Sequence, residues 1–270
     1  MNTAINSGHH HIADADIKGY FDAILKERLM RLVETKIADG RILALIRQYL
    51  NQGIMDNGHE EAASERGTPQ GAVLSPLLAN IYLDPFDHHM ESLGTHLVRY
   101  ADDFVVMCES EAEARAMLEA IRAWMEENGL TLHPTKTRIV DARQPGGFDF
   151  LGYHFEQGRR WPSKKASDKF KDKIRELTPR NSGESMTRII AQVNLYLRGW
   201  FEYFKHSERW QMSRSDGYIR GRMRSILRRR AGKRGRGRGS GNQRWPNRYF
   251  TEAGLFSLAQ AHALACESRK

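Results

Sequence analysis

The chain has 270 residues, of which 40% are hydrophobic, and its formal net charge is +9. That length can bury one large core or two modest ones, and no apolar run approaches the ~18–20 residues needed to span a bilayer. The two cysteines, Cys108 and Cys266, are too few for a disulfide framework. The composition therefore excludes a disulfide-stapled secreted domain and a membrane-spanning protein, and the cytoplasm is the expected location.

The charge is divided sharply along the chain. Residues 1–150 contain 14 Lys/Arg and 23 Asp/Glu, whereas residues 151–270 contain 28 Lys/Arg and 10 Asp/Glu. Such asymmetry indicates an acidic half that performs chemistry and a basic half that holds a polyanion. The alternative is a well-solvated basic surface, but the basic residues are interleaved with aromatic residues and glycines rather than with acids.

The first elements alternate between strand-like and helical patterns. A short strand is expected at residues 11–17, followed by helices at about 26–36 and 41–51. The second helix is expected to place four apolar side chains on one face: Ile42, Leu45, Ile46 and Tyr49. Residues 53–67 form a polar, turn-rich stretch, and a Ser-Pro start signal then opens a buried helix over residues 75–83.

A hairpin is predicted next, because the strand-like runs 95–100 and 104–108 flank a short acidic turn. Ser110 with Glu113 forms a capping-box pattern that opens a helix, and Asn128-Gly129 ends it. Strands are expected around 130–132, 138–140 and 148–155. The first half is therefore predicted to be an α+β layer in which helices cover one face of a small antiparallel sheet.

The second half is predicted to be mostly helical. The composition turns basic near residues 156–167, and helical patterns follow at 168–177, 186–206 and 216–230. The Arg-Gly run at residues 232–241 cannot pack a core and indicates a flexible cationic loop. A last short helix is expected at 254–265.

The acidic turn is the strongest chemical signal. Adjacent carboxylates at a turn are usually solvated, but Asp102 and Asp103 lie between two apolar strands, and a second acid-bearing strand ends at Asp16. Juxtaposed carboxylates repel one another unless a cation neutralises them, and oxygen ligands suit Mg²⁺. Two such ions about 3.5–4 Å apart can activate a 3′-hydroxyl and stabilise a leaving pyrophosphate.

Several motifs in register resemble those of reverse transcriptases, and most closely those of group II intron-encoded reverse transcriptase/maturases. They are residues 16–22 (DIKGYFD), 66–76 (RGTPQGAVLSP), 100–103 (YADD), 129–137 (GLTLHPTKT), 148–153 (FDFLGY), 197–204 (LRGWFEYF), 245–250 (WPNRYF) and 254–258 (GLFSL). The resemblance covers roughly residues 11–262. It implies a polymerase palm with residual fingers at 1–160, a basic helical thumb/maturase domain at 161–270, and RNA-directed DNA polymerase activity.

The resemblance also implies roles for residues of the palm. Asp16, Asp102 and Asp103 match the metal-binding acids, which would hold two Mg²⁺ ions. Lys136 matches the lysine proposed to protonate the leaving pyrophosphate, although a lysine after a turn is usually a surface residue. Phe21 matches the aromatic residue that lies under the incoming sugar and selects deoxynucleotides; the alternative is a core aromatic.

Further roles concern the nucleotide and the nucleic acid. Gln70 and Gly71 match the loop that touches the incoming nucleotide and the template, and Arg66 is either a phosphate contact or a surface charge. The hairpin that grips the primer end is matched by Phe150, Leu151 and Gly152, for which core packing is a compatible alternative. The arginines expected to line one helix and bind RNA phosphates are Arg222, Arg224, Arg228, Arg229 and Arg230.

The implied partners are an RNA template, intron RNA, a DNA or RNA primer and deoxynucleoside triphosphates, with no membrane. His9–His11 and His88-His89 lack a CxxC or HExxH pattern, so no zinc site is expected. Only about fifteen residues precede Asp16, fewer than the family's fingers, so we expect a truncated chain or one piece of a split protein with a separate fingers-bearing polypeptide. Two alternatives stay open: a maturase-like RNA-binding splicing factor with little or no polymerase activity, and an inactive fragment of a mobile element.

Overall fold

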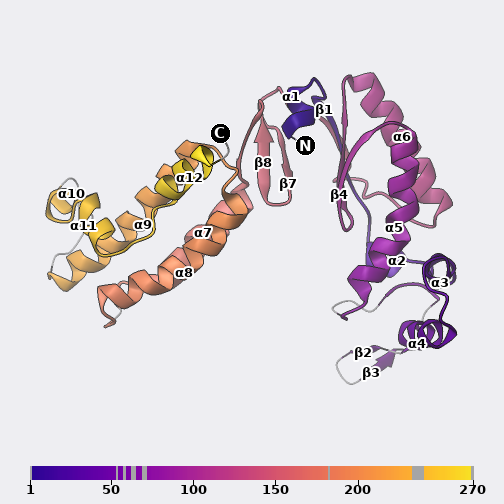
Figure 1. Cartoon of the computed structure of the whole chain (residues 1–270), viewed down its shortest axis with the longest axis horizontal. Coiled ribbons are helices and arrows are strands. Elements are labelled where there is room, and N and C mark those ends of the chain that lie inside the picture. The colour runs from indigo at the N-terminus through magenta and orange to yellow at the C-terminus, as the bar shows by residue number, and fades with distance from the viewer. Residues whose placement is uncertain are drawn as a thin grey trace. The chain divides into compact units, whose positions relative to one another are not determined.

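The computed structural model describes residues 2–52, 54–56, 59–61, 65–68, 72–181, 183–232 and 240–268. The chain divides into two compact units, Met1–Phe148 and Asp149–Lys270. Small antiparallel sheets are combined with helices in the first unit, and helices dominate the second, which confirms the predicted α+β class (Figure 1). Among the described residues, no helix is long and apolar enough to cross a bilayer.

The first unit is built on a four-stranded sheet in the order β4-β5-β1-β6. The strands are β1 (His11–Asp16), β4 (His96–Tyr100), β5 (Asp103–Cys108) and β6 (Arg138–Asp141), and their pairings are antiparallel. Every residue of β5 from Phe104 to Cys108 is buried, as expected for a central strand of apolar sequence. The predicted strand at the start of the chain and the predicted hairpin are both confirmed.

Two helices, α5 (Ser75–Ser92) and α6 (Glu111–Glu127), pack against this sheet (Figure 1). Phe86 of α5 lies at the centre of the contact, where its ring centroid is 5.1 Å from both Phe104 of β5 and Trp124 of α6. All atoms of Phe86 and Phe104 are shielded from solvent, and burying one such ring contributes about 1.5–3 kcal/mol. The helices therefore cover one face of the sheet, as predicted.

The predicted capping box opens α6. Ser110 Oγ accepts the Glu113 N–H at 3.2 Å, and the Glu113 carboxylate accepts the Glu109 N–H at 2.9 Å. The helix ends before Gly129, whose φ is 72°. This left-handed conformation favours glycine, and a Cβ at the position would lie 2.7 Å from Leu25 Cδ1, so the leucine side chain would have to shift.

The elements between β1 and α5 are short. They are α2 (Tyr20–Ala23), α3 (Lys26–Glu34), α4 (Gly40–Leu50), β2 (Ile54–Asp56) and β3 (His59–Glu61), and α1 (Asn2–Asn6) precedes β1. The predicted apolar face of α4 was wrong in part: Ile46 and Leu50 are buried, whereas Ile42 and Leu45 are 46% and 64% exposed. Helix α4 contacts α3, and its Ile46 and Leu50 belong to the core of the unit, whereas Ile42 and Leu45 do not.

The predicted single strand at 148–155 is two strands. They are β7 (Phe148–Phe150) and β8 (Tyr153–Glu156), and a third strand, β9 (Arg159–Pro162), completes a sheet in the order β7-β8-β9. Leu151 and Gly152 reverse the chain with φ of 47° and 75°. Leucine rarely adopts positive φ, so the apolar sequence at residues 148–155 did not indicate a turn at Leu151.

The second unit packs three long helices around its own core. They are α7 (Lys164–Leu177), α8 (Met186–Phe204) and α9 (Arg209–Arg230), followed by α10 (Ser240–Arg244), α11 (Asn247–Glu252) and α12 (Leu258–Glu267). The face predicted for α8 is buried: Ile189, Ile190, Val193, Leu197, Phe201 and Phe204. Helix α9 begins earlier than predicted, because Met212 and Ser215 join its buried face.

A buried acid ties α9 to α12. Asp216 is 3% exposed, and its carboxylate accepts the Ser257 hydroxyl at 2.7 Å. It also accepts the backbone N–H groups of Leu258 at 3.0 Å and Ala259 at 3.3 Å, in the first turn of α12. These donors are among the N–H groups that a helix start leaves without an intrahelical acceptor, so Asp216 caps α12 from a distant part of the chain.

Candidate active site

The antiparallel register of β1 and β5 brings two of the predicted acids together. Asp16, the last residue of β1, is directly opposite Asp103, the first residue of β5. Asp103 also pairs with Tyr100 across the hairpin, so Ala101 and Asp102 form its two-residue tip. Ala101 has a φ of 56°, a left-handed conformation that costs a residue with a Cβ about 1–2 kcal/mol. The tip that carries Asp102 is therefore a constrained turn.

Asp14 joins this acidic cluster, although it was not among the predicted site residues. It lies two residues before Asp16 on β1, so both side chains project from the same face of the strand. Its carboxylate is 3.2 Å from Nε of Arg138, which is its register partner on β6. The alternating sequence Asp14-Ala15-Asp16 was the signal that could have found it.

The neighbouring acids of the cluster act on the pKa of Asp103. Burial, together with the charges of Asp14, Asp102 and Asp16, raises the pKa of its carboxyl group to about 6, against the opposing effect of Lys136. The charges of Asp14, Asp16 and Asp102 are therefore close enough to disfavour the ionised form of Asp103.

Lys136 lies at the same cluster. Its Nζ is 2.5 Å from Asp16 Oδ2, and this hydrogen bond raises the pKa of the ammonium group, as do the charges of Asp102 and Asp103. The segment is held there by a hydrogen bond from the His133 N–H to the Asp16 carbonyl, at 2.7 Å. The structure thus brings together the four residues predicted to act in catalysis.

The donor set suits a hard divalent cation. All four acids offer carboxylate oxygens, and like-charge repulsion within the cluster is relieved when a cation binds. Asp16 and Asp103 face each other across the strand pair, and Asp102 follows from the tip. Over the ranges that the structure describes, no three His, Cys, Asp or Glu side chains converge with ready-made metal-site geometry. The Lys136 ammonium lies 2.5 Å from a carboxylate oxygen of Asp16.

Phe21 is placed beside the motif that begins at Arg66. Its carbonyl accepts the Thr68 N–H at 2.9 Å, and Arg66 forms an isolated β-bridge with Leu25. Gly67 has a φ of 87°, in the left-handed region that favours glycine. The half-buried Phe21 ring is 5.7 Å from the ring of buried Tyr20. Phe21 therefore has both core contacts and some exposed surface.

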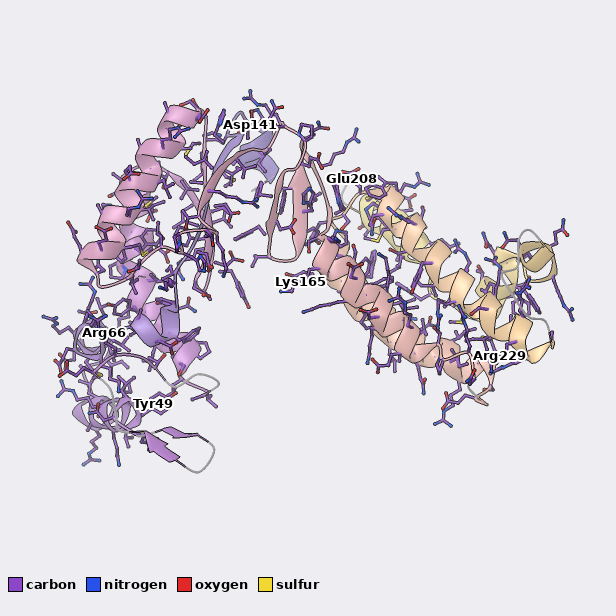
Figure 2. The ribbon with its side chains drawn as sticks, turned by 180° about the vertical axis from the view of Figure 1, so that it is seen from behind. Tyr49, Arg66, Asp141, Lys165, Glu208 and Arg229 are labelled. Atoms are coloured by element: carbon purple, nitrogen blue, oxygen red, sulfur yellow. The ribbon has the colours of Figure 1, made fainter. Side chains whose placement is uncertain are left out.

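Arg66 itself is exposed, and Figure 2 shows it above Tyr49 in the lower part of the first unit. Its charge opposes the burial that raises the pKa of Tyr82, so its guanidinium lies near that side chain. The predicted nucleotide contacts Gln70 and Gly71 lie outside the described residues. Their roles stay predictions.

The predicted primer-grip residues belong to the β7–β8 turn. Phe150 is buried, and the Leu151 carbonyl accepts the Tyr203 hydroxyl at 2.8 Å. The Gly152 carbonyl accepts the Ser163 N–H at 2.8 Å, at the start of α7. The turn is therefore attached firmly to the helices of the second unit.

The arginines predicted to bind RNA have different surroundings along α9. Arg222 donates to the Thr178 hydroxyl at 3.1 Å and to the Thr178 carbonyl at 2.6 Å, and Arg230 donates to the Glu184 carbonyl. Arg228 is half-buried. Arg229 is exposed at the far end of α9 from Glu208 (Figure 2). Arg222 is thus committed to joining α9 to the end of α7.

Comparisons with known proteins cover both units. The family model for reverse transcriptase (RNA-dependent DNA polymerase) matches residues 2–155, and the model for the group II intron, maturase-specific domain matches residues 167–245. Protein YkfC of Escherichia coli (strain K12) is 28% identical over 219 residues, which cover 68% of this chain and 56% of that protein. The group II intron-encoded protein LtrA of Lactococcus lactis subsp. cremoris is 42% identical over 80 residues, 30% of this chain and 13% of that protein.

The fold is similar to that of a solved structure, apo telomerase from Candida tropicalis. The TM-score is 0.54 at 11% identity, over 93% of this chain and 45% of the telomerase chain. This likeness supports the α+β fold alone. The chain spans 56% and 13% of the two curated relatives named above, so the activities of those whole proteins do not transfer to it directly.

Proposed function

The chain belongs to the reverse transcriptase (RNA-dependent DNA polymerase) family, in the group II intron-encoded reverse transcriptase/maturase group, and we propose that it is an RNA-directed DNA polymerase. The reaction is attack of a primer 3′-hydroxyl on the α-phosphate of a deoxynucleoside triphosphate, with pyrophosphate as the leaving group. The proposal concerns the first unit. The acidic cluster of Asp16, Asp102 and Asp103 is the observation that carries it.

Asp16, Asp102 and Asp103 would hold two Mg²⁺ ions. When bound, these cations would favour the deprotonated 3′-hydroxyl and neutralise charge on the pyrophosphate. The raised pKa of Asp103, caused by burial and neighbouring acids, supports this assignment, because such a site favours binding of an external cation.

Lys136 would donate the proton that the leaving pyrophosphate takes up. Its ammonium group is held at the acidic cluster by Asp16, and the surrounding carboxylates keep it protonated. Phe21, half-buried against Tyr20, would lie under the incoming sugar and exclude a 2′-hydroxyl. Gln70 and Gly71 would contact the nucleotide and the template, and Phe150 to Gly152 would hold the primer end.

The second unit would hold RNA. Residues 151–270 carry 28 Lys/Arg against 10 Asp/Glu, and the maturase-specific domain model matches within this region. A concentration of basic residues on one domain is the electrostatic footprint of a nucleic-acid partner. The partners would be an RNA template and intron RNA, together with a DNA or RNA primer.

Primer extension on an RNA template with deoxynucleotides and Mg²⁺ tests the proposal. Asp102→Asn removes one metal ligand with little change in volume, and we expect extension to fall about 1,000-fold or more, equivalent to about 4 kcal/mol of transition-state stabilisation. Glu127→Gln is the matched control, since it removes one negative charge from an exposed position in the same unit. Equal synthesis by the Asp102 variant and the wild type would refute the polymerase assignment.

A second candidate function is supported by the maturase-domain match: an RNA-binding splicing factor that acts without DNA synthesis. It predicts tight, salt-sensitive binding to structured group II intron RNA that survives Asp102→Asn. Random-sequence RNA of the same length is the control. If the two RNAs bind with the same affinity, this candidate fails.

A further inference from the structure

A surface groove of about 530 Å³ runs along α9, and we name it the glycine groove. One wall is formed by four residues of α9: Gly217, Arg220, Gly221 and Arg224. The facing side includes Asn242 of α10 and Asn247 of α11. None of the described residues that line the groove is acidic or aromatic. The groove is therefore a cationic channel with amide groups opposite.

Both arginines of the groove are held in place. Arg224 donates from Nε to the Trp245 carbonyl at 2.8 Å and from Nη2 to Asn247 Oδ1 at 2.7 Å. Its guanidinium carbon is also 5.2 Å from the centre of the Phe250 ring. Arg220 Nη1 is 3.7 Å from an Asp216 carboxylate oxygen. A guanidinium group has five N–H donors, so these contacts orient each cation while leaving donors for an anion.

Among the described residues, no packing contact explains why these two positions of α9 are glycine. Gly217 and Gly221 are one turn apart in the middle of α9, where glycine is less favourable than alanine. Both are exposed, and a Cβ built on either would meet no atom of the described residues within 4 Å. The space beside the helix backbone is therefore open to the groove. Close approach of a ligand backbone is a reason for glycine that the internal packing does not supply.

We propose that the glycine groove binds the sugar–phosphate backbone of RNA. Arg220 and Arg224 would contact phosphate oxygens, and the ribose–phosphate chain would lie against the helix at Gly217 and Gly221. Phosphate is the ligand that a fixed guanidinium recognises best, and a lining without aromatic rings offers no platform for base stacking. The maturase-domain match extends over the groove residues from Gly217 to Asn242. For this reason we propose RNA as the polyanion that binds there. The inference rests on the proposed RNA-binding role of the second unit and names its site.

The groove changes which arginines of α9 are assigned to RNA. Arg224 was expected from the sequence, but Arg220 was not, and Arg222 is used internally at Thr178. Backbone contacts carry little sequence information, so binding at the groove is insensitive to base sequence and strongly dependent on salt.

The test uses the full chain and a 5′-fluorescein-labelled oligo(U) RNA of about 16 nucleotides, followed by fluorescence anisotropy between about 50 and 200 mM KCl. Gly217→Leu with Gly221→Leu fills the groove with good helix formers. We expect binding to weaken about tenfold or more while the melting temperature is unchanged or higher. Arg220→Gln should lower the slope of log Kd against log salt by about 0.7, the value for one phosphate contact on a single strand.

Arg214→Gln is the matched control, because Arg214 is an exposed arginine of the same helix and is not part of the groove lining. It should change the affinity less than twofold. The proposal is overturned if the double leucine variant binds as the wild type does, or if the Arg214 and Arg220 variants weaken binding equally. Because Arg220 faces buried Asp216, its variant is first checked for a normal melting curve; if it is destabilised, the leucine variant decides the question.

The outcome is independent of the polymerase assignment. The Asp102→Asn variant should bind oligo(U) as the wild type does. A loss of primer extension by this variant therefore does not count against RNA binding at the glycine groove. Conversely, a wild-type chain that extends primers but binds oligo(U) without salt dependence would contradict RNA binding at the glycine groove. The polymerase assignment of the acidic cluster would be unaffected.

Discussion

Asp103 in the first unit and Asp216 in the second are both shielded carboxylates, but their surroundings have opposite character. Asp103 lies among Asp14, Asp16 and Asp102, and its pKa is about 6 because of burial and these like charges. Asp216 is 3% exposed and accepts hydrogen bonds from the Ser257 hydroxyl and two backbone N–H groups of α12, with Arg220 at 3.7 Å.

The difference indicates that Asp216 is a structural acid, whereas Asp103 belongs to a cluster suited to binding a cation. The protein satisfies the oxygens of Asp216 with its own donors, so this carboxylate stabilises the contact between α9 and α12. The acids around Asp103 repel one another, and a ligand cation is the natural remedy. The same contrast holds along the chain, since residues 1–150 have an excess of acids and residues 151–270 an excess of bases. Three experiments test how far this comparison holds.

The largest effect is expected for Asp216→Ala. It leaves the N–H groups of Leu258 and Ala259 and the Ser257 hydroxyl without their acceptor, which should cost about 2–4 kcal/mol in the free energy of unfolding of the second unit. Urea denaturation measures this loss. Asp216→Asn keeps one carbonyl acceptor and should cost less. A loss below about 0.5 kcal/mol for the alanine variant would mean that Asp216 is not a structural acid.

An intermediate effect, opposite in sign, is expected for Asp103→Asn without metal. The pKa of Asp103 is raised from 3.8 to about 6, so the folded chain binds this proton more tightly than the unfolded chain does. The contribution of Asp103 to the free energy of unfolding therefore decreases as the pH rises from about 4 to 6, by about 1–3 kcal/mol in total. The asparagine variant lacks this loss, and its stability relative to the wild type should increase over the same pH range.

Thermal melts from pH 4 to 8 with a chelator present measure that difference, with Glu127→Gln as the exposed control. If the difference in melting temperature between the Asp103 variant and the wild type is constant with pH, then the pKa of Asp103 is not raised in the folded chain. In that case the contrast with Asp216 is lost.

The smallest effect is expected for a pair of matched cap variants, Ser110→Ala in the first unit and Ser163→Ala in the second. Each Oγ accepts a backbone N–H at 3.2 Å at the start of a helix, α6 or α7. Each variant should lose about 1 kcal/mol of stability. Hydrogen exchange of the α6 and α7 amides shows which unit is affected. If either variant accelerates exchange equally in both helices, the two units unfold as one and cannot be compared separately.

Local patterns predicted the elements that have strong caps and clear periodicity. The capping box at Ser110 and Glu113 located α6, and the apolar runs on either side of Asp102 located the hairpin. The patterns failed where no local signal exists. Leu151 turns the chain with positive φ in an otherwise strand-like run, and Leu45 remains in solvent although its spacing is that of a buried face.

The sequence by itself determined the order of the motifs, the opposite charges of the two halves and the identity of three acids, because these are properties of single residues and their neighbours. The tertiary structure decided which contacts those acids make, both with Lys136, which the resemblance predicted, and with Asp14, which the sequence analysis did not name. Lys136 reaches Asp16 across 120 residues, and Asp14 enters the cluster because β1 is paired with both β5 and β6. It also showed that Arg222 is committed to Thr178 while Arg220 lines a groove. Such partners are fixed by strand register and helix packing between distant segments, which no local pattern encodes.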